Sequence, residues 1–270
     1  MSYQATDKFV FPKWANYFLP LIVLSVLGGG MVVPPLVLYG FSAETQNVGF
    51  QPEQPVPYSH AIHVGQLGLD CRYCHNTVDD SSFASIPPTQ TCINCHAPGQ
   101  YLEGDDRGLP TNLSGIHQAS QNLRPVWESS ETGVAVPWIK VHDLADYGYF
   151  DHSAHVSKGV GCVTCHGRVD LMGASGSTDM IAGVYQVNNL SMGWCIECHR
   201  APEQHLRPLA EVTNMQWSPL DDTRVQAEIA AGNTDLEDET VAQLWLGNLL
   251  KRKYEINDAA YMQSCTTCHR

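Results

Sequence analysis

The sequence predicts a protein of short α-helices and loops with little sheet, preceded by one transmembrane helix. Three observations support this prediction. Residues 17–41 are almost wholly apolar. The 270-residue chain contains 22 glycines and 16 prolines, which interrupt long regular elements. All ten cysteines fall into one short repeated pattern, which indicates that bound groups organise the rest of the chain.

That pattern is Cys-x-x-Cys-His, and it occurs five times with no cysteine left over. Cys-x-x-Cys alone is shared by zinc sites, thiol oxidoreductases and c-type haem attachment sites. Disulfides do not require a histidine after each pair, and five pairs do not divide into closed four-ligand zinc sites. Two such thiols can bond both vinyl groups of one porphyrin, with the adjacent imidazole as proximal iron ligand. The sequence therefore predicts five covalently bound haem c groups, at Cys71/Cys74/His75, Cys92/Cys95/His96, Cys162/Cys165/His166, Cys195/Cys198/His199 and Cys265/Cys268/His269.

Five haems leave little polypeptide for each porphyrin, so stacked macrocycles must supply much of the buried apolar area. The expected fold is therefore a multihaem c-type cytochrome, mainly short helices and loops around stacked haems. The formal net charge of −13 argues against nucleic acid as a partner. An acidic surface keeps a protein soluble and attracts the basic faces of partners.

The apolar N-terminal segment predicts a membrane anchor. The 23 residues from Tyr17 to Tyr39 carry no charge, which is long enough to span a bilayer. Lys8 and Lys13 precede this segment and acidic residues follow it, so the N-terminus is expected in the cytoplasm and the haem domain in the periplasm of a bacterial inner membrane. The alternative is a cleaved signal peptide, whose apolar core is shorter, about 7–15 residues.

An internal repeat divides the rest of the chain. Residues 58–80 and 150–171 align, so that each attachment motif is preceded by His-x-x-His and followed by a second motif. We expect a cytoplasmic segment (1–16), an anchor (17–40), a first two-haem module with a linker (41–141), a second two-haem module (142–220), and C-terminal helices with the fifth haem (221–270).

The histidines left over supply candidates for the sixth iron ligand. In His60/His63 and His152/His155, two imidazoles on one helical turn share a face and can serve two adjacent haems. His60 is expected to complete the Cys71 haem and His152 the Cys162 haem, while His63 and His155 reach other haems. The fifth distal ligand is less defined: His142 is the first choice, Met172 and Met192 are alternatives, and His117 and His205 lie in loop-like sequence.

The remaining segments indicate scaffold. Residues 221–231 predict a short helix ended by Gly232, and residues 239–253 predict a longer one. The longer helix carries Val241, Leu244, Trp245 and Leu249 on one face, which we expect to pack on haem or on a partner. Segments 97–137 and 201–220 are rich in Pro, Gly and polar residues and predict long loops.

These motifs resemble a known family. His-x-x-His before Cys-x-x-Cys-His resembles the class III multihaem cytochromes. KVHDLADYGYFDHSAHVSKGVGCVTCHG and LSMGWCIECHRAPEQHLRP are similar to the pentahaem cytochrome of bacterial alternative complex III, a quinol:electron-acceptor oxidoreductase of the inner membrane. The resemblance covers essentially the whole chain. It implies these partners: integral quinol-binding subunits, a monohaem cytochrome c and an iron–sulfur/molybdopterin-like subunit.

The leading functional prediction is an electron-transfer subunit that passes electrons from a membrane quinol-oxidising complex to a periplasmic cytochrome c or terminal oxidase, and that is not an enzyme by itself. One alternative is a self-sufficient, membrane-anchored quinol dehydrogenase. Another is a catalytic multihaem reductase, which needs an open iron site, often at a motif with Lys in place of His. All five motifs here end in His, which argues against the reductase.

Overall fold

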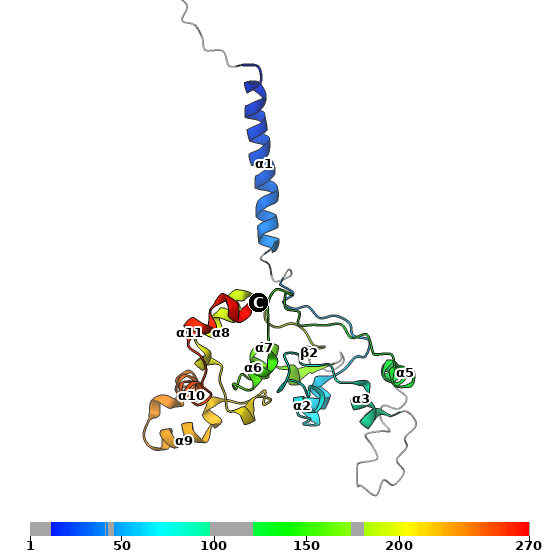
Figure 1. Cartoon of the computed structure of the whole chain (residues 1–270), viewed down its shortest axis with the longest axis vertical. Helices are drawn as coiled ribbons and strands as arrows, with labels where there is room; N and C mark the ends of the chain where they lie inside the picture. Colours follow the sequence, from blue (N-terminus) through cyan, green and yellow to red (C-terminus); the bar gives the residue numbers. More distant parts are fainter. Residues whose placement is uncertain (1–11, 41, 43–45, 98–120, 174–180, 270) are drawn as a thin grey trace, which may run out of the picture. The chain divides into compact units, whose positions relative to one another are not determined.

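A computed structural model describes residues 12–40, 42, 46–97, 121–173 and 181–269. The chain divides into two compact units, Met1–Asn47 and Val48–Arg270. The first unit contains one long helix, and the second contains all five attachment motifs (Figure 1).

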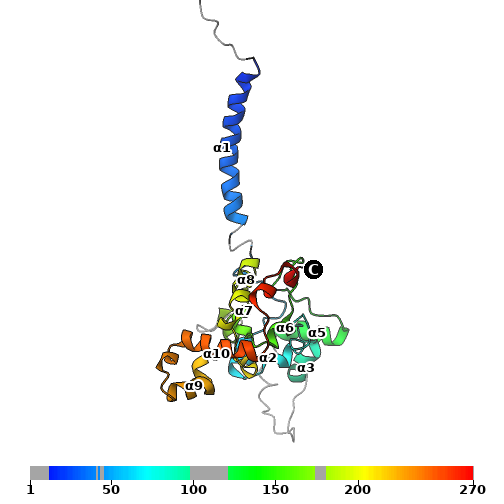
Figure 2. The same cartoon turned by 60° about the vertical axis from the view of Figure 1, so that its left-hand side comes forward.

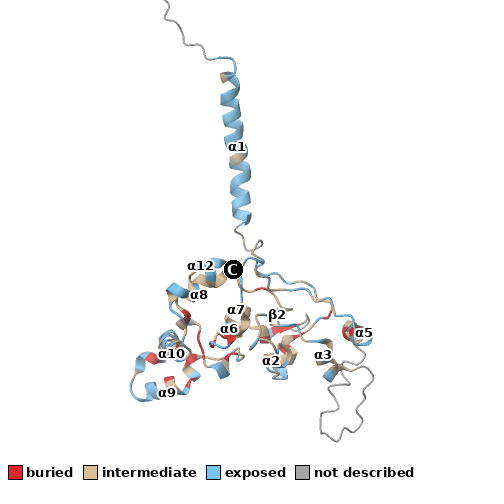
Figure 3. Cartoon of the chain, in the orientation of Figure 1, coloured by how far each residue is buried: buried red, intermediate tan, exposed pale blue. Residues whose placement is uncertain are grey.

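The first unit contains α1, which spans Ala15–Gly40 and is 26 residues long. This helix is long and apolar enough to cross a membrane by length and composition. None of its residues is buried, and most of its large apolar residues are exposed, so that nearly the whole helix has the exposed colour in Figure 3. A helix that is apolar on every side requires an apolar environment, which a bilayer or neighbouring helices can provide.

The second unit is built from short helices joined by loops, as the sequence predicts. Its α-helices are α2 (Cys71–Cys74), α3 (Thr89–His96), α5 (Arg124–Thr132), α6 (His152–Val156), α7 (Cys162–His166), α8 (Met192–Arg200), α9 (Thr223–Ala230), α10 (Glu239–Lys253), α11 (Ala259–Met262) and α12 (Cys265–Cys268). A π-helical turn, η1 (Ala61–Gln66), and several 3₁₀ turns lie between them. In the part of the chain that the structure describes, the sheet is limited to β1 (Met172–Gly173), which pairs in parallel with β2 (Ile181–Ala182). The expected fold class of short helices, loops and little sheet is confirmed.

The two C-terminal helices form where the sequence predicts them. Asp222 caps α9 by accepting a hydrogen bond from the backbone N–H of Arg224, and Asp238 caps α10 in the same way. These carboxylates satisfy N–H groups that have no partner within the helix, and they complement the helix dipole. Gly232, with φ at +103°, follows α9 and takes a conformation that favours glycine. Figure 2 shows α9 and α10 side by side, away from α3 and α5.

The main hydrophobic cluster joins these helices to residues around Leu206. Its buried members are Leu206, Val225, Leu236, Ala242, Leu246 and Leu250. The face that packs on this cluster differs in part from the face expected to meet haem or a partner: Val241 and Leu244 are 42% and 37% exposed, while Ala242, Leu246 and Leu250 are buried. The reason is that α10 packs on the polypeptide at 203–206, where Gln243 Nε2 donates to the carbonyls of Glu203 and Leu206 at 3.0 and 2.8 Å.

A second correction concerns the predicted loop 97–137, of which residues 98–120 lie outside the described part. Residues Arg124–Thr132 form α5, which packs against α3. Pro125 lies in its first turn and Gly133 ends it with φ at +72°, the arrangement that suits these residues at helix ends. Trp127 Nε1 donates to the carbonyl of His96 at 2.7 Å, so α5 supports the end of an attachment motif.

Candidate haem-binding site

The two cysteines of each attachment motif lie on one short helix. These helices are α2, α3, α7, α8 and α12. The two cysteines of a motif are three residues apart, so on a helical turn both thiols point to the same side. Ahead of α2, Asp70 fixes the first turn by accepting the N–H of Arg72 at 2.8 Å. All ten cysteines are free thiols, none of them in a disulfide. Each motif thus presents a pair of thiols in the arrangement that two thioether bonds to one porphyrin require.

The motifs follow one another in a row. The Cys71 and Cys162 side chains are close enough to shift each other's pKa, which places the first motif beside the third. Burial raises the pKa of Cys74, and the nearby Cys95 thiol raises it further. Cys95 belongs to the second motif, so the second motif also lies beside the first. Burial and then Cys198 raise the pKa of Cys165 to about 12, and Cys268 acts on Cys195 in the same way. The helices that carry the motifs therefore run in the order α3, α2, α7, α8, α12 (Figures 1 and 3).

Three motif histidines donate a hydrogen bond from Nδ1 to a backbone carbonyl. The acceptors are Ser85 O for His75 at 2.8 Å, Met262 O for His199 at 2.9 Å, and Tyr147 O for His269 at 2.8 Å. A carbonyl oxygen can only accept, so Nδ1 carries the proton and Nε2 is left as the bare nitrogen. Imidazole binds a metal through an unprotonated Nε2, and the hydrogen bond at Nδ1 holds the ring in place.

Three of the His-x-x-His histidines are held in the same way. Nδ1 of His63 is 2.8 Å from Ser59 O, Nδ1 of His155 is 2.7 Å from Asp151 O, and Nδ1 of His152 is 2.8 Å from Ser82 O. The first two bonds reach back four residues and correspond across the repeat. His60 and His63 lie at the start of the π-helical turn η1, whereas His152 and His155 lie on α6.

Three of these histidines face a motif histidine. The ring centroids are 6.1 Å apart in His63–His96, 6.4 Å in His152–His166 and 6.2 Å in His155–His199. A first-row metal binds an imidazole nitrogen at about 2 Å, so two rings on opposite sides of one iron have centroids roughly 6 Å apart. The three pairs therefore have the spacing that a six-coordinate iron between them requires.

His60 is half-buried near His75. Its Nδ1 has no hydrogen-bond partner, and burial, followed by the charges of His75 and His63, lowers its pKa to about 4. The imidazole is therefore neutral at neutral pH, which is the state that ligates a metal.

The His142 ring lies beside the His166 ring of the third motif. Its ring centroid is 4.4 Å from that of His166 at an interplanar angle of 73°, which is too close for two ligands on opposite sides of one iron. Its Nε2 is buried without a partner. Burial and then His142 lower the pKa of His166 to about 3. The structure thus brings His142 to the third motif, while no imidazole faces His269 among the residues described.

The other candidates lie in or after three different elements. Met172 is 1% exposed and lies in β1, and Met192 is 64% exposed at the start of α8. His205 follows the 3₁₀ turn Pro202–Gln204, and burial lowers its pKa. His117 lies outside the described residues. Neither methionine has a placement that assigns it to an iron.

Two aromatic residues belong to the site but were not singled out from the sequence. Tyr58 stacks on His63 at 4.4 Å and meets His60 edge-on at 4.8 Å. Phe150 stacks on His155 at 4.6 Å and meets His152 edge-on at 4.8 Å. Each aromatic residue precedes its first histidine by two positions, so the aligned repeat itself contains the signal.

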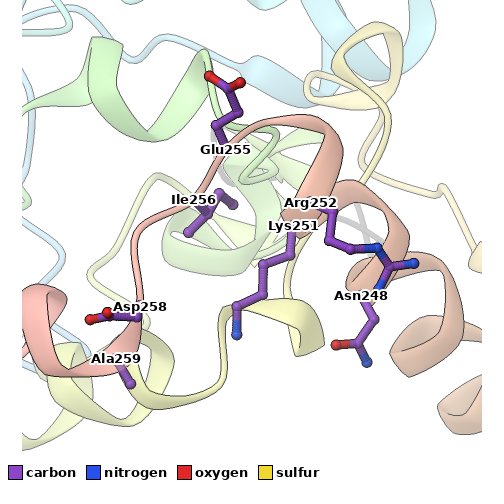
Figure 4. Close-up of a pocket in the computed structure, with 7 residues that line it drawn as sticks. All are labelled: Asn248, Lys251, Arg252, Glu255, Ile256, Asp258 and Ala259. Atoms are coloured by element: carbon purple, nitrogen blue, oxygen red, sulfur yellow. The ribbon is translucent and has the colours of Figure 1, made fainter.

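Two pockets lie in the second unit. One, of about 260 Å³, opens beside Cys71 between η1 and residues 213–216. The other, of about 430 Å³, lies at the end of α10, and its charged side chains fan out without converging on one point (Figure 4). Only the first pocket includes an attachment residue.

Taken with the scarcity of buried apolar side chains outside the C-terminal cluster, the paired thiols and opposed imidazoles fit haem c. Comparison with known proteins points the same way. No family model matches the chain. The chain is 29% identical over 188 residues to the multihaem cytochrome c subunit of menaquinone reductase from Nitratidesulfovibrio vulgaris strain Hildenborough. The match covers 66% of this chain and 80% of that protein, so the chain is similar to a multihaem cytochrome c over most of its length.

Proposed function

We propose that this chain is a five-haem electron-transfer subunit of a membrane-bound quinone or quinol oxidoreductase complex. The observation that carries the proposal is the set of three imidazole pairs, each joining an attachment motif to a His-x-x-His histidine at 6.1–6.4 Å. Bound haem c supplies one-electron exchange between ferric and ferrous iron. With both axial positions of an iron filled by imidazoles, no position is left open for a substrate, which favours electron transfer over catalysis.

The residues have separate roles in this proposal. The ten motif cysteines hold the porphyrins, and the five motif histidines are the proximal ligands. His63, His152 and His155 are the distal ligands opposite His96, His166 and His199, and His60 serves His75. The backbone carbonyls at Nδ1 fix the ring orientations and make the Nε2 nitrogens better donors. The distal ligand opposite His269 comes from His142 after a displacement, from a methionine, or from outside the described residues.

The partners follow from the two resemblances. The relative belongs, by its name, to a menaquinone reductase, and the sequence motifs resemble the pentahaem cytochrome of alternative complex III. We therefore place the chain in a complex with integral quinol-binding subunits, a monohaem cytochrome c and an iron–sulfur/molybdopterin-like subunit. In this arrangement α1 anchors the chain in the inner membrane, and Val48–Arg270 lies on the periplasmic side.

Native electrophoresis tests this proposal. Membranes are extracted in mild detergent, and the gel is stained for haem and assayed for menaquinol oxidation with an added electron acceptor. We expect a haem band of several times the mass of this chain, with co-migrating membrane subunits and with haem reduction by menaquinol. A haem band of this chain alone that oxidises menaquinol indicates the self-sufficient dehydrogenase instead. A chain that carries no haem contradicts both.

The direction of electron flow is tested in the same extract. Under anaerobic conditions, menaquinol or a reduced periplasmic cytochrome c is added separately, and the haem absorbance is followed. Reduction by menaquinol with onward transfer to cytochrome c supports quinol oxidation. Reduction by the cytochrome, followed by reoxidation with menaquinone, supports the reverse reaction that the name of the relative describes.

A further inference from the structure

Arg207 is a buried cation beside the third attachment motif. The residue is 8% exposed, and its guanidinium lies against Gly161, the residue that precedes Cys162. A Cβ at Gly161 would overlap the guanidinium, with Nη1 only 2.8 Å away. The glycine at this position therefore allows the charge to approach the backbone of the motif.

Neutral groups surround this guanidinium. Nη1 donates to Asn214 O at 2.9 Å, and the guanidinium lies over the Trp217 ring at 5.0 Å. Nε is buried with no hydrogen-bond partner. The carboxylate of Glu211 acts on Arg207 from a distance and accepts a hydrogen bond from the Asn214 side chain at 2.8 Å.

Four other arginines of this unit are paired with acids. Their ion pairs are Arg72–Asp79 at 3.0 Å, Arg124–Glu128 at 2.9 Å, Arg168–Asp170 at 2.7 Å and Arg224–Asp222 at 2.6 Å. Across the residues that the structure describes, no carboxylate lies within ion-pairing distance of Arg207. A buried charge without a counter-ion is costly, so its retention calls for a compensating role.

The turn that Arg207 holds touches two attachment motifs. Val212 O accepts the N–H of Cys162 at 3.1 Å, and Thr213 Oγ1 donates to Asp70 Oδ2 at 2.9 Å, next to Cys71. The side chains of Cys71 and Cys162 are themselves close together. Arg207 is therefore at the junction of the two repeated modules, close to the attachment points of the first and third motifs.

The field of a buried charge is weakly screened, because little water surrounds it. Reduction of ferric haem adds one negative charge, which a nearby cation stabilises. We propose that Arg207 is a potential-tuning residue that raises the reduction potential of the haem held at Cys162, and to a smaller extent that of the haem at Cys71. The inference rests on the proposed function, since it requires the haems to be present.

The test is a spectroelectrochemical titration of the purified full-length protein with its haems. Arg207→Gln removes the charge and keeps a polar side chain. Arg207→Lys keeps the charge, and Arg252→Gln removes an exposed charge on α10 as a control. We expect one or two of the five redox components to move to more negative potential in Arg207→Gln, and all five to stay near their wild-type values in Arg207→Lys and Arg252→Gln.

An Arg207→Gln protein with five haems and unchanged components overturns the inference, as does an equal shift in the glutamine and lysine variants. If Arg207→Gln does not incorporate five haems, the same titration is made on Glu211→Gln. This variant removes the negative charge that acts on Arg207 and that lowers the net positive field at the haem. A component that moves to more positive potential in Glu211→Gln supports the inference, and no shift overturns it. A wild-type protein without five haems contradicts the proposed function itself, which keeps the two failures distinct.

Discussion

At the scale of single residues, backbone carbonyls fix the orientation of the imidazole rings. Carbonyl oxygens hold the Nδ1 protons of His63, His152 and His155, so each bare Nε2 is directed away from its own backbone. The sequence predicts these residues because His-x-x-His recurs at matching positions of a repeat. It assigned His60 and His152 to the motifs that follow them, but it could not predict which motifs His63 and His155 face, because that depends on how η1 and α6 lie against other helices.

The pairing of His155 with His199 gives a direct prediction. His155→Ala removes the ring 6.2 Å from that of His199, so one haem loses its distal ligand. We expect one of the five haems to change from low-spin to high-spin in the absorption spectrum of the oxidised protein. His205→Ala is the matched control, because His205 faces no motif histidine among the described residues. A folded His155→Ala protein in which all five haems remain low-spin would exclude this pairing.

The stacking of Phe150 on His155 gives a second prediction. Aromatic pairs contribute about 0.5–1.5 kcal/mol beyond the area they bury. We expect Phe150→Ala to weaken the distal ligands His152 and His155, so that low-spin absorption is lost at a lower temperature during heating. Phe150→Tyr keeps the ring and should match the wild-type protein, since tyrosine occupies the equivalent position 58. Identical melting of the low-spin bands in the alanine variant contradicts a positioning role.

At the scale of elements, local signals and packing differ in how far they could be predicted. The bounds of α10 follow from Asp238 at its start and from its basic last turn. Its buried face does not follow from the sequence, because Val241 and Leu244 are as apolar as the residues that are buried. The helix α5 was missed because its composition is polar, although Pro125 and Gly133 mark its ends.

The contact of α10 with the 203–206 segment predicts the effect of one methyl group. A Cβ at Gly247 would overlap the carbonyl of Glu203, a backbone group that cannot move aside alone. Overpacking of this kind costs about 1–3 kcal/mol. We expect Gly247→Ala to lower the free energy of unfolding by that amount in denaturant titration, although alanine is the better helix former. Asn248→Ala, on the exposed side of the same helix, is expected to change it little.

At the scale of the whole molecule, the attachment motifs form one unbranched row with the Cys92 and Cys265 motifs at its ends. The sequence predicted two modules and a fifth motif, but the row depends on the contact between Cys71 and Cys162. That contact arises through residues 212–213, whose polar sequence indicated only a loop. Long-range pairing of this kind leaves no local pattern in a sequence.

The apolar helix α1 predicts how the chain behaves in cells. If α1 is an uncleaved anchor, the full-length chain stays with the membrane after alkaline carbonate washing, and mass spectrometry finds its N-terminal residues intact. A variant in which a cleavable signal peptide replaces residues 1–40 should bind haem and leave the membrane more readily. A mature wild-type protein that begins after α1 indicates a signal peptide and contradicts the anchor.

The central claim is that opposed imidazoles of this chain hold iron, and near-infrared magnetic circular dichroism of the oxidised, purified protein tests it most directly. This measurement distinguishes iron with two imidazole ligands from iron with imidazole and thioether ligands, and from high-spin iron. The three ring pairs predict that at least three of the five haems give the bis-imidazole band. A spectrum in which most haems are high-spin or methionine-ligated would contradict the account.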